Sequence, residues 1–444
     1  MSKMMTRLAG VAAALLLPTL ALAAEAPPPG ACYNGAYALA DGSRFVIQPG
    51  DAPNLRWRML DGTSGKLFPT GEGTYEGGDG WSVRTPVTVK VDFGACGADN
   101  VRFQRGAAPA VEGRRIAQPT TPITFASGDQ TLYGELVMPA SGKARAVVVL
   151  QYGSDKESAV ANNFVQHLLP LKDIAVFVFD KRGTGRSTGA FTANFDIMAD
   201  DMTAAVRAVR ARPEARRLPL GVMGESQGGW VVPIVARKVK VDFVVVSYGL
   251  AVSIIEEDRS EVAQSLAAYG PEVQAQGQAL HDAATKVVLS GMSEGVEDFE
   301  RLKAASAGAP WRKGLGGDYT SLLAGLPPGG IGEVKWLAGL GFQLDYNPVP
   351  TLEDLRVPTL WVLAGKDTSA PHELTLNILR GLQATGSPID VVVFPNADHG
   401  IIAVDAAGKR LGGAAPGYFD LLGDWITTRR LTKPYGDGVQ YKRR

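Results

Sequence analysis

The chain has 444 residues, of which 45% are hydrophobic, so it is long enough to bury more than one core. Its 45 basic and 45 acidic residues balance. This composition argues against a nucleic-acid-binding protein and against attraction to an anionic membrane surface, and it favours a small or neutral molecule as the partner.

The chain begins with the features of a Sec-type signal peptide. Lys3 and Arg7 precede an apolar run from Leu8 to Leu22. Ala21-Leu22-Ala23 has the small-x-small pattern of a cleavage site. The run is short for a membrane span. We therefore expect residues 1–23 to be removed and the mature protein to be periplasmic or secreted, with no stable membrane insertion; the alternative is an uncleaved N-terminal anchor.

A small β-rich domain is expected next, over residues 24–110. Four segments rich in β-forming residues lie between turns: Arg44–Ile47, Leu55–Met59, Val87–Val91 and Val101–Phe103. They predict a small antiparallel sheet with a structural or substrate-shaping role and no chemistry of its own.

Cys32 and Cys96 are the two cysteines of the chain, and both lie in this region. In an oxidising compartment such a pair is most simply a disulfide, and the alternative is two buried free thiols. A metal site of cysteine and histidine is disfavoured, because the four histidines all lie far downstream.

From about Ile116 the pattern changes to alternating strands and helices. A β-hairpin is expected over Ile123–Phe125 and Leu132–Pro139, and a helix over Met198–Arg212. Continuous apolar runs of strand length follow one another at Ala146–Leu150, Ala175–Phe179, Leu220–Met223, Phe243–Ser247, Thr359–Leu363 and Ile389–Phe394. Such runs are typical of strands covered on both faces by helices. The pattern predicts an α/β fold with a doubly wound, mostly parallel sheet over residues 116–431.

Residues 254–346 interrupt this alternation and predict a helical cap. Helical segments are expected over Glu261–Leu289 and Val296–Ala305. The cap also carries aromatic residues that either line a pocket or hold the cap together: Trp311, Tyr319, Trp336 and Phe342.

The sequence Gly224-Glu225-Ser226-Gln227-Gly228 lies between an expected strand and an expected helix. In a G-x-S-x-G turn the serine adopts a strained backbone conformation, and the neighbouring chain comes so close that only glycine fits on either side. The following helix N-terminus favours negative charge beside the serine. Ser226 is therefore the candidate nucleophile, and a solvent-exposed polar serine is the alternative.

A serine hydroxyl needs a base, and the base needs a group that orients it. Asp367 and His399 each follow an apolar strand, so both are expected at the same edge of the sheet as Ser226. Asp398 is a competing acid, but a residue next to His399 in sequence is badly placed to orient the imidazole. Two backbone amides should bind the developing oxyanion: that of Gln227 and that of Ser154, with Gly153 as the alternative to Ser154.

These motifs resemble those of the α/β-hydrolase superfamily over about residues 116–431. The likeness rests on the turn at Gly224–Gly228, Gly365-Lys366-Asp367, Ala397-Asp398-His399-Gly400, and the loop from Asp180 to Ser187. One departure is Tyr152-Gly153, where relatives often have His-Gly, so Ser154 and Gly153 both stay open as the second oxyanion donor. In this family the loop at Asp180 and Arg182 is mainly structural. A serine rather than an aspartate in the turn argues against a dehalogenase-like reaction.

The resemblance implies hydrolysis of a carboxylic ester through an acyl-enzyme, with a small-molecule ester or other acyl compound as substrate and no metal or organic cofactor. Three alternatives stay open: a serine peptidase or amidase, an acyl-thioesterase, and a non-catalytic member of the fold that binds a ligand.

Overall fold

A computed structural model describes residues 30–80 and 84–443 of the chain. The expected signal peptide, residues 1–23, lies outside this part. Among the described residues, no helix has the length and apolar character needed to span a bilayer.

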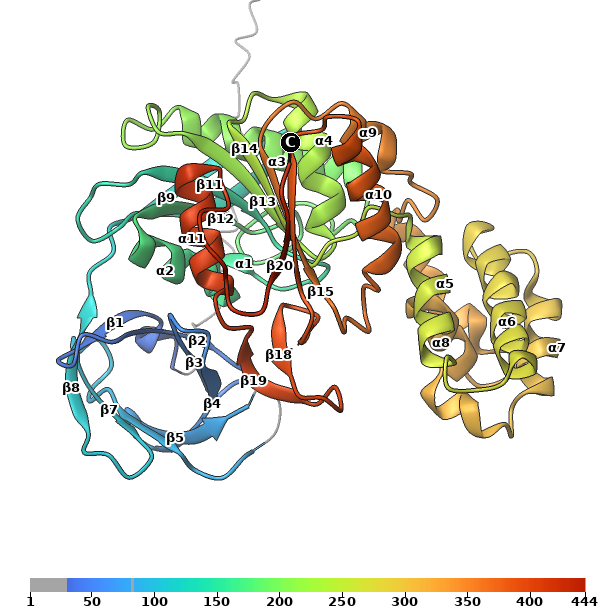
Figure 1. Cartoon of the computed structure of the whole chain (residues 1–444), viewed down its shortest axis with the longest axis horizontal. Coiled ribbons are helices and arrows are strands. Elements are labelled where there is room, and N and C mark those ends of the chain that lie inside the picture. The colour runs from blue at the N-terminus through green and yellow to red at the C-terminus, as the bar shows by residue number, and fades with distance from the viewer. Residues whose placement is uncertain (1–29, 81–83, 444) are drawn as a thin grey trace, which may run out of the picture.

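An antiparallel β-barrel forms the N-terminal part of the described chain (Figure 1). After a short 3-10 helix, η1 (Ala31–Tyr33), its strands are β1 (Gly35–Leu39), β2 (Arg44–Pro49), β3 (Leu55–Met59), β4 (Ser64–Gly71), β5 (Thr74–Asp79), β6 (Val89–Asp92), β7 (Asn100–Arg105) and β8 (Val111–Ile116). Each strand pairs with the next, and β8 pairs with β1. The antiparallel β structure expected here is confirmed, and its closure into a barrel is an addition to that prediction.

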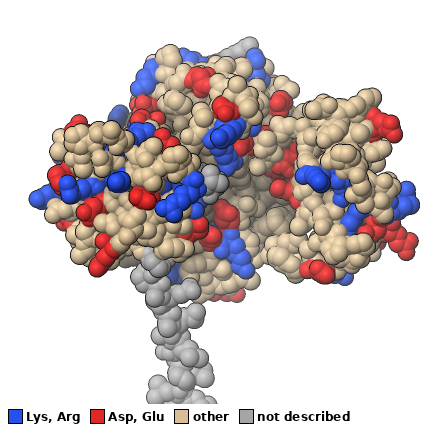
Figure 2. Space-filling model, turned by 90° about the horizontal axis from the view of Figure 1, so that it is seen from below, with Lys and Arg blue, Asp and Glu red and all other residues tan. Residues whose placement is uncertain are grey.

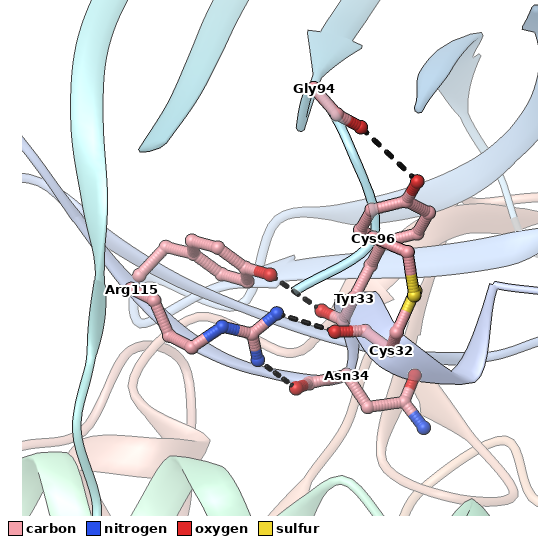
Figure 3. The surroundings of a disulfide bond; sticks show 7 residues. Cys32, Tyr33, Asn34, Gly94, Cys96 and Arg115 are labelled. Carbon is pink, nitrogen blue, oxygen red and sulfur yellow. Dashed lines mark hydrogen bonds between the residues drawn. A yellow bond between two sulfur atoms is a disulfide. The ribbon is translucent and has the colours of Figure 1, made fainter. Parts of the chain in front are cut away.

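The Cys32–Cys96 disulfide joins η1 to the turn before β7 (Figure 3). Arg115 of β8 supports the same place: its guanidinium donates to the backbone carbonyl of Cys32 at 2.6 Å and to that of Asn34. The hydroxyl of Tyr33 donates to the carbonyl of Gly94 at 3.2 Å. The disulfide and these bonds fix the start of the barrel to the turn between β6 and β7 and to β8.

The second unit is a nine-stranded mixed sheet. Its strands are β9 (Thr120–Ser127), β10 (Gln130–Val137), β11 (Ala146–Gln151), β12 (Ile174–Phe179), β13 (Leu220–Glu225), β14 (Phe243–Ser247), β15 (Thr359–Ala364), β16 (Ile389–Phe394) and β20 (Val439–Tyr441). They lie in the order β20-β16-β15-β14-β13-β11-β12-β10-β9. Strands β11 to β16 run parallel, and β9, β10 and β20 are antiparallel to their neighbours. The mostly parallel sheet and the β9–β10 hairpin were both expected, and both are confirmed.

Helices cover both faces of this sheet. One face packs against α3 (Phe195–Arg210), α4 (Gly228–Lys238) and α10 (Glu373–Ala384), through residues such as Met202, Val231 and Leu379. The other packs against α1 (Ala159–Asn162), α2 (Val165–Leu168), the 3-10 helix η2 (Leu169–Lys172) and α11 (Tyr418–Thr428). Because both faces are covered, the central strands are buried along their whole length, which accounts for their continuous apolar sequences.

The segment between β14 and β15 is helical, and its helices α5 to α8 stand to one side of the sheet (Figure 1). It comprises α5 (Ile254–Ser265), α6 (Pro271–Leu289), α7 (Val296–Ala305), η3 (Pro310–Gly314), α8 (Asp318–Gly325), η4 (Gly330–Leu340) and α9 (Val349–Glu353). We call α5 to α8 the cap. Trp311 and Tyr319 are buried within it, whereas Trp336 is 65% exposed and Phe342 is 40% exposed.

One helix of the cap differs from the sequence prediction. A single helical segment was expected over Glu261–Leu289, but the chain turns between α5 and α6. Pro271 has no amide hydrogen and suits the first position of a helix, so α6 begins there and α5 ends before it.

A small three-stranded sheet connects the end of β16 to the barrel. It consists of β17 (Ala397–Asp398), β18 (Ile402–Val404) and β19 (Arg410–Ala414). The Ala414 amide donates to the carbonyl of Gly62 at 2.8 Å, and a side chain at Gly412 would come within 2.3 Å of the Gly80 nitrogen. The barrel therefore sits in backbone contact with the loops that leave the carboxyl edge of the main sheet.

Candidate active site

Ser226 lies on a sharp turn between β13 and α4. Its φ is 50°, a left-handed conformation that is rare for a residue with a side chain. A Cβ at Gly224 would lie 2.3 Å from the Gly228 carbonyl oxygen, and a Cβ at Gly228 would lie 2.7 Å from the Gln151 carbonyl oxygen. Both contacts are shorter than heavy atoms tolerate. The glycines on either side of Ser226 are thus required by the close packing of the turn.

Ser226, His399 and Asp367 form a continuous hydrogen-bonded chain. The Nε2 atom of His399 lies 3.1 Å from the Oγ of Ser226. Its Nδ1 atom lies 3.0 Å and 3.1 Å from the two carboxylate oxygens of Asp367. The structure therefore brings together the three side chains that sequence reasoning selected, from three separate loops at one edge of the sheet.

The surroundings hold both Asp367 and His399 in place. Asp367 is 1% exposed, and its Oδ1 accepts hydrogen bonds from the amides of Ser369 at 3.0 Å and Ala370 at 2.8 Å. These bonds stabilise the negative charge of a buried carboxylate. The ring of Tyr248 meets the imidazole of His399 edge-on, with centroids 5.0 Å apart. The imidazole is therefore held from two sides.

Asp398, the competing acid, is turned away from the imidazole and toward β19. Its carboxylate accepts from the Nε of Arg410 at 2.8 Å and from the amide of Thr368 at 3.3 Å. The other histidines also lie elsewhere: His281 is fully buried in the cap, His167 is in α2, and His372 precedes α10. Within residues 30–80 and 84–443, no group of three or more His, Cys, Asp or Glu side chains is placed to hold a metal ion.

The residues whose amides are expected to bind the oxyanion lie near Ser226. Gln227 directly precedes the first residue of α4, so its amide is among those that have no acceptor within the helix. Gly153 follows β11, and a Cβ built there would be 3.6 Å from the Cβ of Ser226. Ser154, the next residue, is exposed. Both Gly153 and Ser154 line the cavity that contains Ser226.

Lys181 stabilises the loop after β11 that contains Gly153. The sequence analysis did not identify this lysine. It is 4% exposed, and its Nζ donates to the Gly153 carbonyl at 2.6 Å. Burial lowers the pKa of Lys181 to about 8. Its neighbours have the structural role that the family resemblance implies: Arg182 forms a bidentate pair with Asp201, at 2.6 Å and 2.7 Å.

Glu225, directly before Ser226, is a second residue that the motif alone does not identify. It is 3% exposed, accepts from Asn163 at 3.0 Å, and is hydrogen-bonded by the hydroxyl of Tyr248. Burial raises the pKa of Glu225 to about 7. This titratable group therefore changes charge near neutral pH immediately beside the candidate nucleophile.

A cavity of about 400 Å³ opens onto Ser226 and His399. The barrel contributes Gln48, Arg56 and Arg58 to its wall. Sequence reasoning expected no chemistry in the barrel, and no local motif marks these three residues. Their place in the wall results from how the barrel packs on the sheet.

The cap contributes carboxyl groups on another side of the site. The surface is hollowed between the barrel and the cap, and acidic side chains border the hollow on the cap side (Figure 2). Burial, reinforced by neighbouring carboxylates, raises the pKa of Glu261 to about 9 and raises those of Glu257 and Asp318.

Comparisons with known proteins agree with this architecture. The family model described as serine aminopeptidase, S33, matches residues 142–286. A protein of Salmonella typhi that carries the assignment carboxymethylenebutenolidase is 28% identical over 157 residues, which cover 31% of this chain and 58% of that protein. The chain thus spans little more than half the length of this curated relative.

Among solved structures, an esterase of Pyrococcus furiosus aligns with a TM-score of 0.41 and 16% identity, over 64% of this chain and 84% of that chain. An acylaminoacyl peptidase of Pyrococcus horikoshii aligns with a TM-score of 0.43 and 12% identity, over 88% of this chain and 57% of that one. The strand order, the turn at Ser226 and the sequence matches together show an α/β-hydrolase fold that follows an N-terminal eight-stranded β-barrel.

Proposed function

We propose that this protein is a serine hydrolase that cleaves carboxylic esters through an acyl-enzyme on Ser226. The observation that carries the proposal is the hydrogen-bonded chain Ser226–His399–Asp367, with Nε2 to Oγ at 3.1 Å and Nδ1 to carboxylate at 3.0 Å. These lengths are those that proton transfer from serine to imidazole requires.

In the proposed reaction, Ser226 Oγ attacks the ester carbonyl while His399 Nε2 takes its proton. His399 then gives that proton to the departing alcohol, and a water molecule activated by the same nitrogen hydrolyses the acyl-enzyme. Asp367 accepts from Nδ1–H, which fixes the tautomer of the imidazole and stabilises its charged form. Each step conserves protons between serine, histidine, alcohol and water, so it needs no further reactant.

The amides of Gln227 and of Ser154 or Gly153 would bind the oxyanion of the tetrahedral intermediate. The close approach of Gly153 to Ser226 and the bond from Lys181 to the Gly153 carbonyl support this assignment. The same proposal assigns residues 24–110 to a β domain, 116–431 to the catalytic domain and 254–346 to the helical insertion that contains the cap.

Export to the periplasm or the medium is part of the proposal. The N-terminal sequence pattern supports it, and so does the Cys32–Cys96 disulfide, because disulfides persist in oxidising compartments. Peptide or amide cleavage is the second candidate, because the matching family model bears the name of a serine aminopeptidase.

The test is turnover of p-nitrophenyl esters of rising chain length, alongside aminoacyl anilides, by residues 24–444. We expect ester hydrolysis that falls by on the order of 10⁶ in Ser226→Ala, as for nucleophile loss in a comparable triad. Ser293→Ala, on the exposed surface of the cap, is the matched control.

An active Ser226→Ala protein would refute the assignment of the nucleophile. Anilide cleavage without ester turnover would make the protein a peptidase. If no substrate is turned over and a fluorophosphonate probe does not label Ser226, the chain is a ligand-binding member of the fold.

A further inference from the structure

Two neighbouring strands of the sheet end in the same unusual backbone conformation. Glu225 of β13 is paired with Ser247 of β14. The next residue on each strand is left-handed, with φ of 50° at Ser226 and 45° at Tyr248. This conformation is costly for a residue with a side chain, and it occurs mostly at active and binding sites. The turn at Ser226 presents the candidate nucleophile, and the turn at Tyr248 directs a phenol ring against His399.

The Tyr248 side chain connects the imidazole of His399 to the carboxyl group of Glu225. Its ring meets the imidazole edge-on, with centroids 5.0 Å apart, and its hydroxyl is hydrogen-bonded to Glu225. Burial, reinforced by the charge of Glu225, raises the pKa of Tyr248 well above its usual value. The phenol therefore stays protonated and donates to the carboxylate. His399 is thus linked to two carboxylates, to Asp367 directly and to Glu225 through a tyrosine.

Asn163 holds Glu225 on another side. The side-chain oxygen of Asn163 accepts from the amide of Val165 at 2.8 Å, so its amide nitrogen faces Glu225 and donates to it at 3.0 Å. An asparagine amide fixed in this way offers the carboxyl a donor and no acceptor. Asn163 and Tyr248 thus both donate hydrogen bonds to Glu225, and such bonds favour the ionised carboxylate.

The charge of Glu225 depends on its whole surroundings. The titratable or charged groups that face it come from the barrel, the loop after β11, the end of β14 and α11: Arg58, Tyr152, Asp155, Tyr248 and Tyr418. Three more line the same cavity: Arg56, His399 and Arg410. Arg58 attracts the carboxylate and Asp155 repels it, but burial has the largest effect and raises the pKa of Glu225 to about 7. Near neutral pH the group therefore exists both as a carboxylate and as a neutral carboxyl.

We propose that Tyr248 and Glu225 are positioning residues for the proposed hydrolysis and that they act through His399. The bond from the Tyr248 hydroxyl to the Glu225 carboxylate holds the phenol ring against the imidazole. His399 becomes positively charged when it takes the proton of Ser226, and the negative charge of Glu225 stabilises it in a buried region where water screens little. Protonation of Glu225 removes this charge. The inference rests on the proposed function of the triad, and it adds a second carboxylate that must be ionised.

The test compares kcat/KM for a p-nitrophenyl ester in the wild type and in Glu225→Gln, from pH 5 to pH 8. Glutamine resembles the protonated carboxyl in shape and charge, so the ratio of the two activities isolates the effect of the carboxylate. Protonation of the base His399 lowers the activity of both proteins and does not by itself change the ratio. We expect the wild type to exceed the variant about tenfold at pH 8, as for a hydrogen bond to a charged group, and to match it at pH 5.

Tyr248→Phe tests the link between the two side chains. The ring that contacts His399 remains, and only the hydroxyl that binds Glu225 is lost. We expect the same loss at pH 8 as in Glu225→Gln, and no further loss when both changes are combined, because residues that act through one bond are not additive. Glu294→Gln and Tyr269→Phe, at exposed positions between helices of the cap, are the matched controls and should leave kcat/KM unchanged.

A ratio that is the same at pH 5 and pH 8 would show that the charge of Glu225 is not used. Losses that add in the double variant would show that Tyr248 and Glu225 act separately. Either result would overturn the inference while leaving Ser226-dependent hydrolysis intact.

The rate at which a fluorophosphonate probe labels Ser226 gives the same comparison without an ester. If labelling follows the expected ratio but no ester is hydrolysed, the positioning pair is supported and the proposed function is refuted. A wild type that the probe does not label would overturn both.

Discussion

At the residue scale, the buried carboxyl of Glu225 makes the free energy of unfolding depend on pH. Its side chain is enclosed by Asn163, Tyr248 and Arg58, and the pKa lies near 7 rather than near 4.5. A carboxyl whose pKa is raised by folding binds more protons in the folded than in the unfolded state between these two values. The free energy of unfolding therefore falls as the pH rises through this window.

We predict that Glu225→Gln removes this dependence. Relative to the variant, the wild type should lose about 3 kcal/mol of stability between pH 4.5 and pH 7.5, from the shift of the pKa to about 7. Urea unfolding of both proteins at pH 4.5 and pH 7.5 measures the difference. Parallel stability curves for the two proteins would show that Glu225 does not titrate in this range.

Lys181 leads to a prediction on catalysis rather than stability. Its bond to the Gly153 carbonyl orients the loop whose amide we assign to the oxyanion hole. Lys181→Met should lower kcat by about 10²-fold, similar to the loss of one oxyanion donor, with little change in KM. Lys156→Met, exposed in the same loop region, is the control. A rise in KM at unchanged kcat would show that Lys181 acts on ground-state binding instead.

At the scale of elements, the sequence predicts those helices and strands that depend on residues close together in the chain. The buried strands, the hairpin β9–β10 and helix α7 follow from runs and periods within a few residues. Closure of the barrel does not, because β1 and β8 pair across more than seventy positions, and no short pattern encodes that pairing. For the same reason the three triad candidates were found from their motifs, whereas Arg56 and Arg58 were not.

A network of hydrogen bonds around Asp258 holds the helices of the cap together. This carboxylate on α5 is fully buried, and it accepts from His281 of α6 at 2.8 Å and from the amides of Tyr319 and Thr320 in α8 at 2.8 Å and 3.1 Å. Three helices thus meet at one side chain. The network lies inside the cap, so its role is structural.

Replacing Asp258 should therefore loosen the cap. The Thr320 hydroxyl also donates to Asp258, so Asp258→Asn places an amide group where four donors converge. We expect a loss of about 1–3 kcal/mol, the cost of leaving a buried donor unsatisfied. Thermal unfolding measures it, with Asp282→Asn as the control, since the Asp282 side chain is 56% exposed. Equal melting temperatures for the two variants would show that the cap does not depend on the network.

At the scale of the whole molecule, the candidate site lies between three units. The barrel lies on one side, the cap on another, and the carboxyl edge of the sheet supplies Ser226, His399 and Asp367 (Figure 1). Ala36 and Val46 of the barrel belong to the same buried cluster as Trp425 of α11 and Val148 of β11. Because barrel and sheet share this core, a change in barrel stability reaches the cavity wall.

The disulfide provides the test of this coupling. Cys32 and Cys96 are 64 positions apart, and closing a loop of that length stabilises a fold by about 4 kcal/mol in the chain-entropy model. The Cys32→Ser, Cys96→Ser double variant should therefore lose activity on heating at a lower temperature than the wild type. A reductant should lower the inactivation temperature of the wild type to that of the variant and leave the variant unchanged. If reduction destabilises the barrel but activity survives to the original temperature, the barrel and the catalytic unit unfold independently.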